Sequence, residues 1–220
     1  TQSSGQGHET SFTQVVSAWL GVPFEAIDMA TGDTDRLAVG GGTHSDRSIR
    51  MGGKVMVEAS DQIIAKGKAI ASHILDAAEA DVEFAAGRFI VAGTDRSIGI
   101  FEVARAASRG EVPDDLAGPL AGEGQYVGRL PAYPNGSAVC EVEIDPATGV
   151  VELKRYSVVD DVGRVINPMI VHGQTHGGIA QGVGQALLEH CVYEEGTGQL
   201  LAGSFMDYCM PRADDLPFFA

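Results

Sequence analysis

The sequence has few cysteines and few basic residues. Its three cysteines are Cys140, Cys191 and Cys209, and none has a second Cys or a His at the short ligand spacings, such as C-x2–4-C, that zinc and iron–sulfur sites use. Such spacing is typical of reduced thiols in a cytoplasmic protein. Only 15 Lys and Arg residues oppose 30 Asp and Glu residues, which gives a net charge of −15. This charge argues against nucleic-acid binding, because phosphate backbones require clustered basic residues.

Long apolar runs are also missing. No run reaches the roughly 18 to 20 residues that cross a bilayer, and residues 1–10 lack the basic and apolar regions of a signal peptide. We therefore predict a cytoplasmic protein without a membrane span. With 44% hydrophobic residues, the 220-residue chain can bury a core in one or two domains. It begins at Thr1 without a methionine, so we expect a fragment of a longer protein.

Hydrophobic periodicity predicts an α+β protein with helices packed on mixed or antiparallel sheets. Apolar residues recur at helical spacing from Phe12 to Leu20, with Thr10 or Ser11 as the expected cap, and again from about Ser45 to Ala78. Alternating apolar and polar residues, bounded by turn residues, predict strands or hairpins in the segments 26–30, 82–91, 138–159 and 192–201. Cys209 is expected to be an inert buried thiol.

The distribution of proline and glycine predicts two subdomains. Residues 111–137 form the expected linker or long loop, because proline and glycine are frequent there. Residues 1–110 precede it and contain two candidate binding loops and the long helix. Residues 138–220 follow it and contain a β-hairpin and a glycine-rich helix.

The glycine-rich helix lies within Asp160–His190. A helix interior with many glycines is costly, at about 1 kcal/mol each relative to alanine. Five glycines fall in one span, Gly173, Gly177, Gly178, Gly182 and Gly184. One explanation is close approach of a ligand or another backbone, with Gln174 able to donate to and accept from a heterocycle. The other explanation is ordinary tight helix packing.

Two upstream loops have the composition of an anion site. Gly5–His8 leads into the first helix, whose free N–H groups and positive dipole end suit a phosphate. Val39–Ser48 contains three successive glycines, whose amides can form a nest, followed by hydroxyl donors and Arg47. Simple capping and a flexible surface loop are the structural alternatives.

Other polar pairs permit different chemistry. His172 and His176 have the i, i+4 spacing of metal ligands, although no Glu or third ligand accompanies them, so a His-ligated hydrolase is a separate alternative. Asp160 and Asp161 are neighbours on a predicted strand, and strand neighbours point to opposite faces. At most one of them can face a site.

Three blocks of the sequence resemble one enzyme family. They are GQGHET followed by GDTDRLAVGGGTHSDRS, DDVGRVINP followed by GQTHGGIAQGVGQAL, and GSFMDYCMPRADDLP. In this order they resemble the C-terminal part of the molybdenum-binding large subunit of the xanthine dehydrogenase, aldehyde oxidase and carbon monoxide dehydrogenase family. The blocks span nearly the whole chain, which makes them more specific than a single glycine-rich loop.

The resemblance implies a molybdopterin cofactor, in bacterial members commonly the cytosine dinucleotide. It implies oxidation of an aldehyde, an N-heterocycle or carbon monoxide with oxygen derived from water, and electron transfer to iron–sulfur and FAD partner subunits in a hetero-oligomer. The implied cofactor-binding residues are Gln6 and Gln174 at the pterin, Gly7, Thr10, Thr43, Ser45, Arg47 and Ser48 around the phosphates, and Asp161 at the nucleotide end.

The resemblance also implies that some parts of the reaction centre lie elsewhere. The family's catalytic glutamate and upstream substrate loops have no counterpart in these 220 residues. We therefore expect no catalytic residue in this chain, and no activity from the chain alone. An alternative from a different class is a non-catalytic docking or assembly module that uses the glycine-rich helix.

Overall fold

The structure is a computed structural model that describes residues 1–37, 40–128 and 132–219. The chain divides into two compact units, Thr1–Ala132 and Tyr133–Ala220. Within the predicted linker, residues 129–131 lie outside the described residues, as does Val39 of the predicted glycine loop. Assignment of the units to the two predicted functional subdomains stays a prediction.

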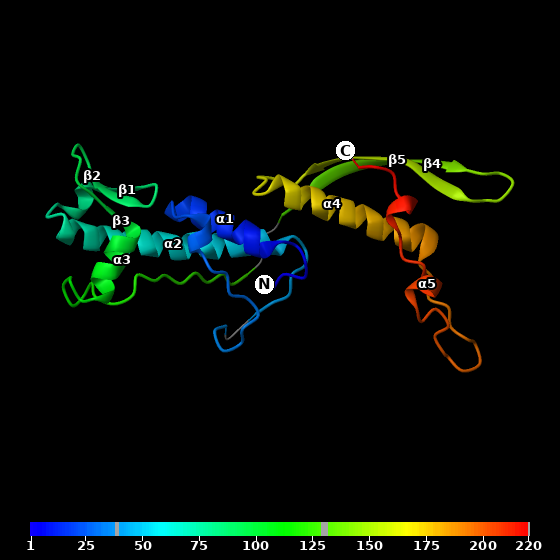
Figure 1. Ribbon diagram of the computed structural model, residues 1–220, viewed down its shortest axis with the longest axis horizontal. Helices are drawn as coiled ribbons and strands as arrows, with labels where there is room; N and C mark the ends of the chain where they lie inside the picture. The colour runs from blue at the N-terminus through cyan, green and yellow to red at the C-terminus, as the bar shows by residue number, and fades with distance from the viewer. Residues whose placement is uncertain (38–39, 129–131, 220) are drawn as a thin grey trace. The chain divides into compact units, whose positions relative to one another are not determined.

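The first unit combines helices with a small sheet (Figure 1). Its elements are α1 (His8–Leu20), the 3-10 turn η1 (Phe24–Ala26), α2 (Arg47–Ile74), the 3-10 turn η2 (Glu79–Asp81), β1 (Val82–Ala85), β2 (Arg88–Val91), β3 (Ser97–Gly99) and α3 (Ile100–Ser108). The strands pair in the antiparallel order β1-β2-β3. Gly21 ends α1 in the left-handed region, at φ 60°, and an added Cβ there would overlap the backbone of the β1–β2 turn.

The hydrophobic core of this unit lies between α2, α3 and the sheet. Its fully buried side chains include Phe89, Ile70, Val82 and Val103. Burial of such a side chain contributes about 1.5–3 kcal/mol. Gly67 of α2 makes room for Phe89, because a Cβ at Gly67 would overlap the aromatic ring.

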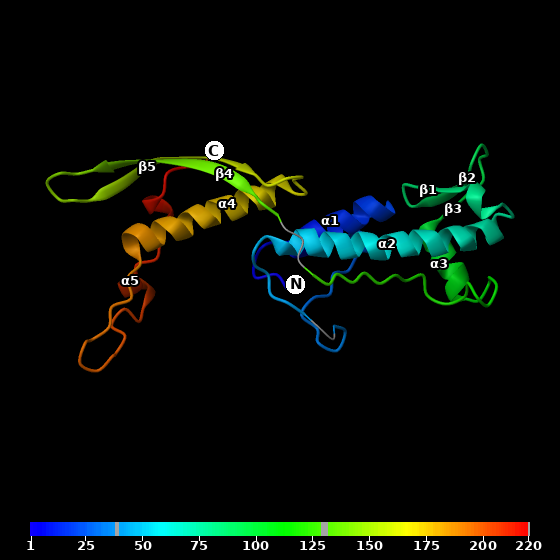
Figure 2. The ribbon, with the colours of Figure 1, turned by 180° about the vertical axis from the view of Figure 1, so that it is seen from behind.

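The segment after α3 returns along α2, as both ribbon views show (Figures 1 and 2). Gln62 Nε2 donates to the Glu123 carbonyl oxygen at 2.7 Å, and the Glu123 N–H donates back to Gln62 Oε1 at 3.1 Å. Lys66 Nζ donates to the Pro119 carbonyl oxygen at 3.2 Å. Much of the predicted long loop is therefore an extended segment held by side chains of α2.

The second unit is built on a long hairpin. β4 (Asn135–Ile144) and β5 (Val151–Asp161) pair antiparallel from Asn135 with Asp161 to Ile144 with Val151, with an irregularity at Glu141/Val142. The later elements are α4 (Pro168–Val183), a π-helical turn η3 (Gly184–Leu188), α5 (Phe205–Tyr208) and the 3-10 turn η4 (Ala213–Asp215). Asn167 caps α4, since its Oδ1 accepts from the Ile170 N–H at 3.1 Å, and Pro168 takes the first helical position.

The α+β class is confirmed, with antiparallel sheets only among the described strands. Several local predictions are wrong. No strand forms at 26–30, where a 3-10 turn follows Pro23, and the long helix ends at Ile74 rather than Ala78. The segment 192–201 forms one isolated bridge, Tyr193 with Leu200. Cys209 is exposed, in a left-handed position after α5.

Candidate functional site

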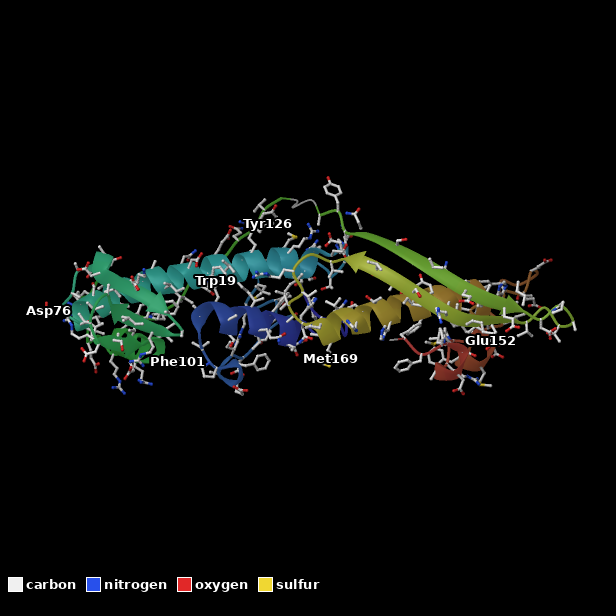
Figure 3. All side chains as sticks on the ribbon, turned by 90° about the horizontal axis from the view of Figure 1, so that it is seen from above. Trp19, Asp76, Phe101, Tyr126, Glu152 and Met169 are labelled. Atoms are coloured by element: carbon white, nitrogen blue, oxygen red, sulfur yellow. The ribbon has the colours of Figure 1, made fainter. Side chains whose placement is uncertain are left out.

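The helices α1 and α2 of the first unit run parallel, so their N-termini lie at one end. Phe12 of α1 packs on Gly52 of α2, where an added Cβ would lie 2.8 Å from the Phe12 ring. About two turns further along both helices, Trp19 Nε1 donates to Asp61 Oδ1 at 2.8 Å. Figure 3 labels Trp19 on α1, next to α2. Residue numbers therefore rise together along the pair, and both ribbon views show α1 alongside α2 (Figures 1 and 2).

Neither helix has a side-chain cap at that end. The N-cap residues are Gly7, at φ 72°, and Asp46, at φ 54°, both in the left-handed region and without a capping hydrogen bond. The predicted capping role of Thr10 or Ser11 is wrong, because both lie inside α1 and donate their N–H groups to the Gly7 carbonyl oxygen, at 3.2 and 3.0 Å. Two positive dipole ends lie side by side, and an anion would relieve their mutual repulsion.

Several backbone donors remain open at these ends. In the described part of the chain, the N–H groups of His8 and Glu9 on α1, and of Ser48 and Ile49 on α2, have no acceptor. We call these two first turns, with residues 43–46 before α2, the two-helix site. Open N–H groups at paired helix N-termini favour a ligand with several anionic oxygens.

Hydroxyl groups connect the segment that precedes α1 with the segment that precedes α2. Thr43 Oγ1 donates to the Gln2 carbonyl oxygen at 2.6 Å, and the buried Ser48 donates from Oγ to Thr43 Oγ1 at 3.3 Å. Ser45 Oγ lies 3.0 Å from His44 Nδ1. The sequence-predicted residues Thr43, Ser45 and Ser48 are thus gathered at the start of α2.

Arg47 contributes a cationic donor at the same place. Its Nη1 lies 3.3 Å from His44 Nε2, and its guanidinium fills the space that a side chain at position 41 would need. Its Nε is buried and has no partner among the described residues. A buried donor without an acceptor costs stability, so an anionic ligand that accepts from Arg47 would remove that cost.

Gln6, Gly7 and Thr10 lie at the corresponding end of α1. Gly7 is its N-cap and Thr10 belongs to its first turn. Gln6 Oε1 accepts from the Ser4 N–H at 2.5 Å and from Ser3 Oγ at 3.5 Å. The structure therefore places seven of the nine predicted residues at or beside the two helix N-termini, namely Gln6, Gly7, Thr10, Thr43, Ser45, Arg47 and Ser48.

His8 is a residue of this site that the sequence prediction missed. It is 5% exposed and stacks on Phe12, with 4.9 Å between ring centroids. Its Nδ1 is buried with no partner among the described residues. Burial lowers the pKa of His8, and the Glu9 carboxylate opposes that shift. The i, i+4 spacing of His8 and Phe12 on the buried helix face was the available signal.

The other two predicted residues, Gln174 and Asp161, belong to the second unit. Gln174 lines an apolar groove of about 700 Å³ between α4 and the β4–β5 hairpin, together with Asp160, Tyr156 and Leu153. Asp161 is not among the lining residues, and its Oδ1 accepts from the Gly163 N–H at 2.9 Å. Of the two adjacent carboxylates, Asp160 therefore faces the groove and Asp161 holds the turn.

The glycines of α4 face open space within the described chain. A Cβ added at Gly173, Gly177, Gly178 or Gly182 would meet no atom of the described residues within 4 Å. Only Gly184, in the following turn, is crowded, by Pro211 and Glu189. The described chain itself therefore does not supply the close neighbour that the glycine content predicts.

The paired histidines of α4 are near each other without a third ligand. The rings of His172 and His176 have centroids 6.2 Å apart, and Phe219 lies 5.1 Å from His176. Within 1–37, 40–128 and 132–219, no group of three His, Cys, Asp or Glu residues could hold a metal ion. No observation in the described residues favours the His-ligated hydrolase.

A family model and several known proteins match nearly the whole of this chain. The family model described as "Molybdopterin cofactor-binding domain" matches residues 1–217. The chain is 38% identical over 216 residues to the 6-hydroxypseudooxynicotine dehydrogenase complex subunit gamma of Paenarthrobacter nicotinovorans, covering 98% of this chain and 27% of that protein. It is 36% identical over 217 residues to the carbon monoxide dehydrogenase large chain of Afipia carboxidovorans, covering 99% and 27%.

Solved structures show the same similarity. A crystal structure of Cu,Mo-CO dehydrogenase superposes with a TM-score of 0.88 at 36% identity, covering 99% of this chain and 27% of that one. Quinoline 2-oxidoreductase from Pseudomonas putida 86 superposes with a TM-score of 0.84 at 35% identity, covering 99% and 28%. The chain thus spans about a quarter of the length of these relatives.

Proposed function

The chain belongs to the molybdopterin cofactor-binding domain family, and from this we propose that it is the cofactor-binding part of a molybdenum hydroxylase large subunit. The proposed reaction is the water-dependent oxidation of an aldehyde, an N-heterocycle or carbon monoxide. When bound, the molybdenum cofactor accepts the electrons of that oxidation. The observation that carries the proposal is the pair of uncapped parallel helix N-termini, beside which the buried Arg47 Nε has no partner among the described residues.

The residues of the two-helix site fit a phosphate-bearing cofactor. The open N–H groups of both first turns and the Arg47 guanidinium would hold the phosphate oxygens, while the hydroxyls of Thr43, Ser45 and Ser48 would donate to them. Gly7 keeps the entrance to α1 free of a side chain. Several positive groups around one ligand would also keep its negative charge out of bulk water at low cost.

The heterocyclic parts of the cofactor need neutral hydrogen-bonding groups. We assign Gln6 and Gln174 to the pterin, because an amide can both donate and accept. Thr10, on the first turn of α1, is proposed for the phosphates and not for the pterin. Asp161 is proposed for the nucleotide end of a cytosine dinucleotide form. Since its Oδ1 already accepts from Gly163, the contact would use the other carboxylate oxygen.

We further propose a hetero-oligomer with iron–sulfur and FAD partner subunits in the cytoplasm. The names "complex subunit gamma" and "large chain" of the relatives support a multi-subunit assembly. Among the described residues, no helix combines the length and hydropathy needed to cross a membrane. The docking-module alternative is not favoured, because the cofactor-binding family model matches 1–217, which includes the glycine-rich helix.

The proposal is tested on the full-length polypeptide purified from its native host with its partner subunits. We expect about one molybdenum and one pterin nucleotide per large subunit. Absence of both from the mature complex would refute the proposal. Analysis of the released nucleotide would show whether it is the cytosine form.

A single substitution tests the two-helix site itself. In cofactor-free full-length protein, Arg47→Ala is expected to weaken inorganic pyrophosphate binding about tenfold or more, because charge-assisted hydrogen bonds contribute about 1.5–3 kcal/mol. Arg105→Ala removes an exposed arginine of α3 and is the matched control. Equal binding by the two variants would show that Arg47 does not hold the phosphates.

A further inference from the structure

His8 is the buried titratable group of the two-helix site that the proposed function leaves without a role. The parallel register of the helices places it. Phe12 packs on Gly52, and His8 stands one turn before Phe12 on the same face of α1. One turn before Gly52 on α2 is Ser48, so this register puts His8 on the face of α1 that packs on α2, level with Ser48.

The imidazole is held in one orientation there. Its face stacks on Phe12 with an interplanar angle of 17°, which directs the ring edge away from the stack. His8 is 5% exposed, and its Nδ1 is buried without a partner in the described part of the chain. Since buried nitrogen atoms are nearly always hydrogen-bonded, the unpaired Nδ1 at this helix N-terminus indicates a missing hydrogen-bond partner.

We propose that His8 is a proton-linked ligand of the cofactor's phosphates, donating from Nδ1–H to a phosphate oxygen and binding a solvent proton at Nε2 as the anion binds. This inference rests on the proposed function. No other reactant is needed, because the proton comes from water and returns to it on release. His8 would thereby be neutral in the free site and positively charged when the ligand is bound.

Burial is the main cause that lowers the pKa of His8 and keeps it neutral in the free site. On α1 its charged neighbour is the Glu9 carboxylate, which opposes the shift. On α2 and the loop before it are Arg47, Arg50, His44 and Asp46, with Arg50 donating to the Asp46 and Ser45 carbonyl oxygens. The two helix dipole ends also disfavour a further cation there, so protonation of His8 becomes favourable only when an anion arrives.

Calorimetry of cofactor-free full-length protein tests this role, with inorganic pyrophosphate as the probe. Binding is measured in two buffers of different ionisation enthalpy at pH 7.5 or so, which gives the protons taken up per pyrophosphate. Pyrophosphate itself titrates in this range, so wild type is compared with His8→Gln, which keeps a neutral donor. We expect greater proton uptake by wild type. When the pH is lowered by two units, the pyrophosphate affinity of wild type should increase about tenfold more than that of His8→Gln.

The controls separate this inference from the proposed function. Phe12→Leu changes the stack but keeps the imidazole, and should retain the extra proton uptake. Equal proton uptake by wild type and His8→Gln, with pyrophosphate still bound, would overturn the role of His8 alone. Failure of wild type, His8→Gln and Phe12→Leu alike to bind pyrophosphate would overturn the two-helix site and the His8 role with it.

Discussion

Adjacent glycines of α2, Gly52 and Gly53, give opposite predictions for the same substitution. An added Cβ at Gly53 meets nothing within 4 Å in the described chain, whereas at Gly52 it would lie 2.8 Å from the Phe12 ring. Gly53→Ala should stabilise α2 by up to about 1 kcal/mol, the difference in helix propensity. Gly52→Ala gains the same amount but overpacks a buried contact, which costs about 1–3 kcal/mol. Its net effect should be a loss of about 0–2 kcal/mol.

Hydrogen exchange of full-length, cofactor-free protein measures this difference locally. Peptides from Arg47–Ile74 should exchange about fivefold more slowly in Gly53→Ala, since 1 kcal/mol is about a factor of five. In Gly52→Ala the same peptides should exchange at the wild-type rate or faster, and pyrophosphate should bind more weakly because α1 is displaced from α2. Slower exchange in Gly52→Ala, equal to that in Gly53→Ala, would refute the parallel packing of the two helices.

Two further predictions concern single side chains. Asn167→Ala should destabilise α4 by about 1 kcal/mol, because the Ile170 N–H loses its cap, and faster exchange of peptides from 168–183 would show it; unchanged exchange would contradict the capping role. The buried His8 has a pKa below its usual 6.5, so the unfolded chain binds the extra proton first, and the ligand-free site should lose stability as the pH falls below 6.5. In His8→Gln, the hydrogen exchange of the α1 peptides should accelerate less than in wild type as the pH falls. An identical pH dependence of exchange in wild type and His8→Gln would contradict this effect of His8.

The elements that could be predicted from the sequence are those with local signals. The hairpins β1–β2 and β4–β5 were predicted because alternation sets the strands and Gly87 and Gly149 supply positive φ, at 76° and 75°. The helices α1 and α2 followed from apolar periodicity. The segment 26–30 was predicted wrongly as a strand because its composition carries no pairing information, and no described strand accepts it.

The residue types of the site were predicted from the sequence, but the arrangement of the two helices that form it was not. Glycines, hydroxyls and Arg47 indicated an anion site, yet the uncapped ends and the parallel pairing depend on contacts between distant residues, such as Phe12 with Gly52. A single sequence gives no direct signal for such a contact. The ligand role of Asp161 stays a prediction, and the structure adds a contact that the sequence did not indicate, a local turn in which its Oδ1 accepts from the Gly163 N–H.

The glycines of α4 lower the stability of the helix, and no packing contact within the described chain compensates for that loss. Alanine at Gly173, Gly177, Gly178 or Gly182 would clash with nothing in the described residues and would favour the helix by about 1 kcal/mol each. The β4–β5 hairpin shows a related feature, because the large apolar side chains of Val139, Ile144 and Val159 are more than half exposed. Internal packing therefore accounts for neither the glycines nor these valines and isoleucine. A helix face without side chains costs stability unless something lies against it, and here the bare face flanks a groove that Gln174 also lines. This combination favours close approach by a ligand or another polypeptide over tight packing within the described chain.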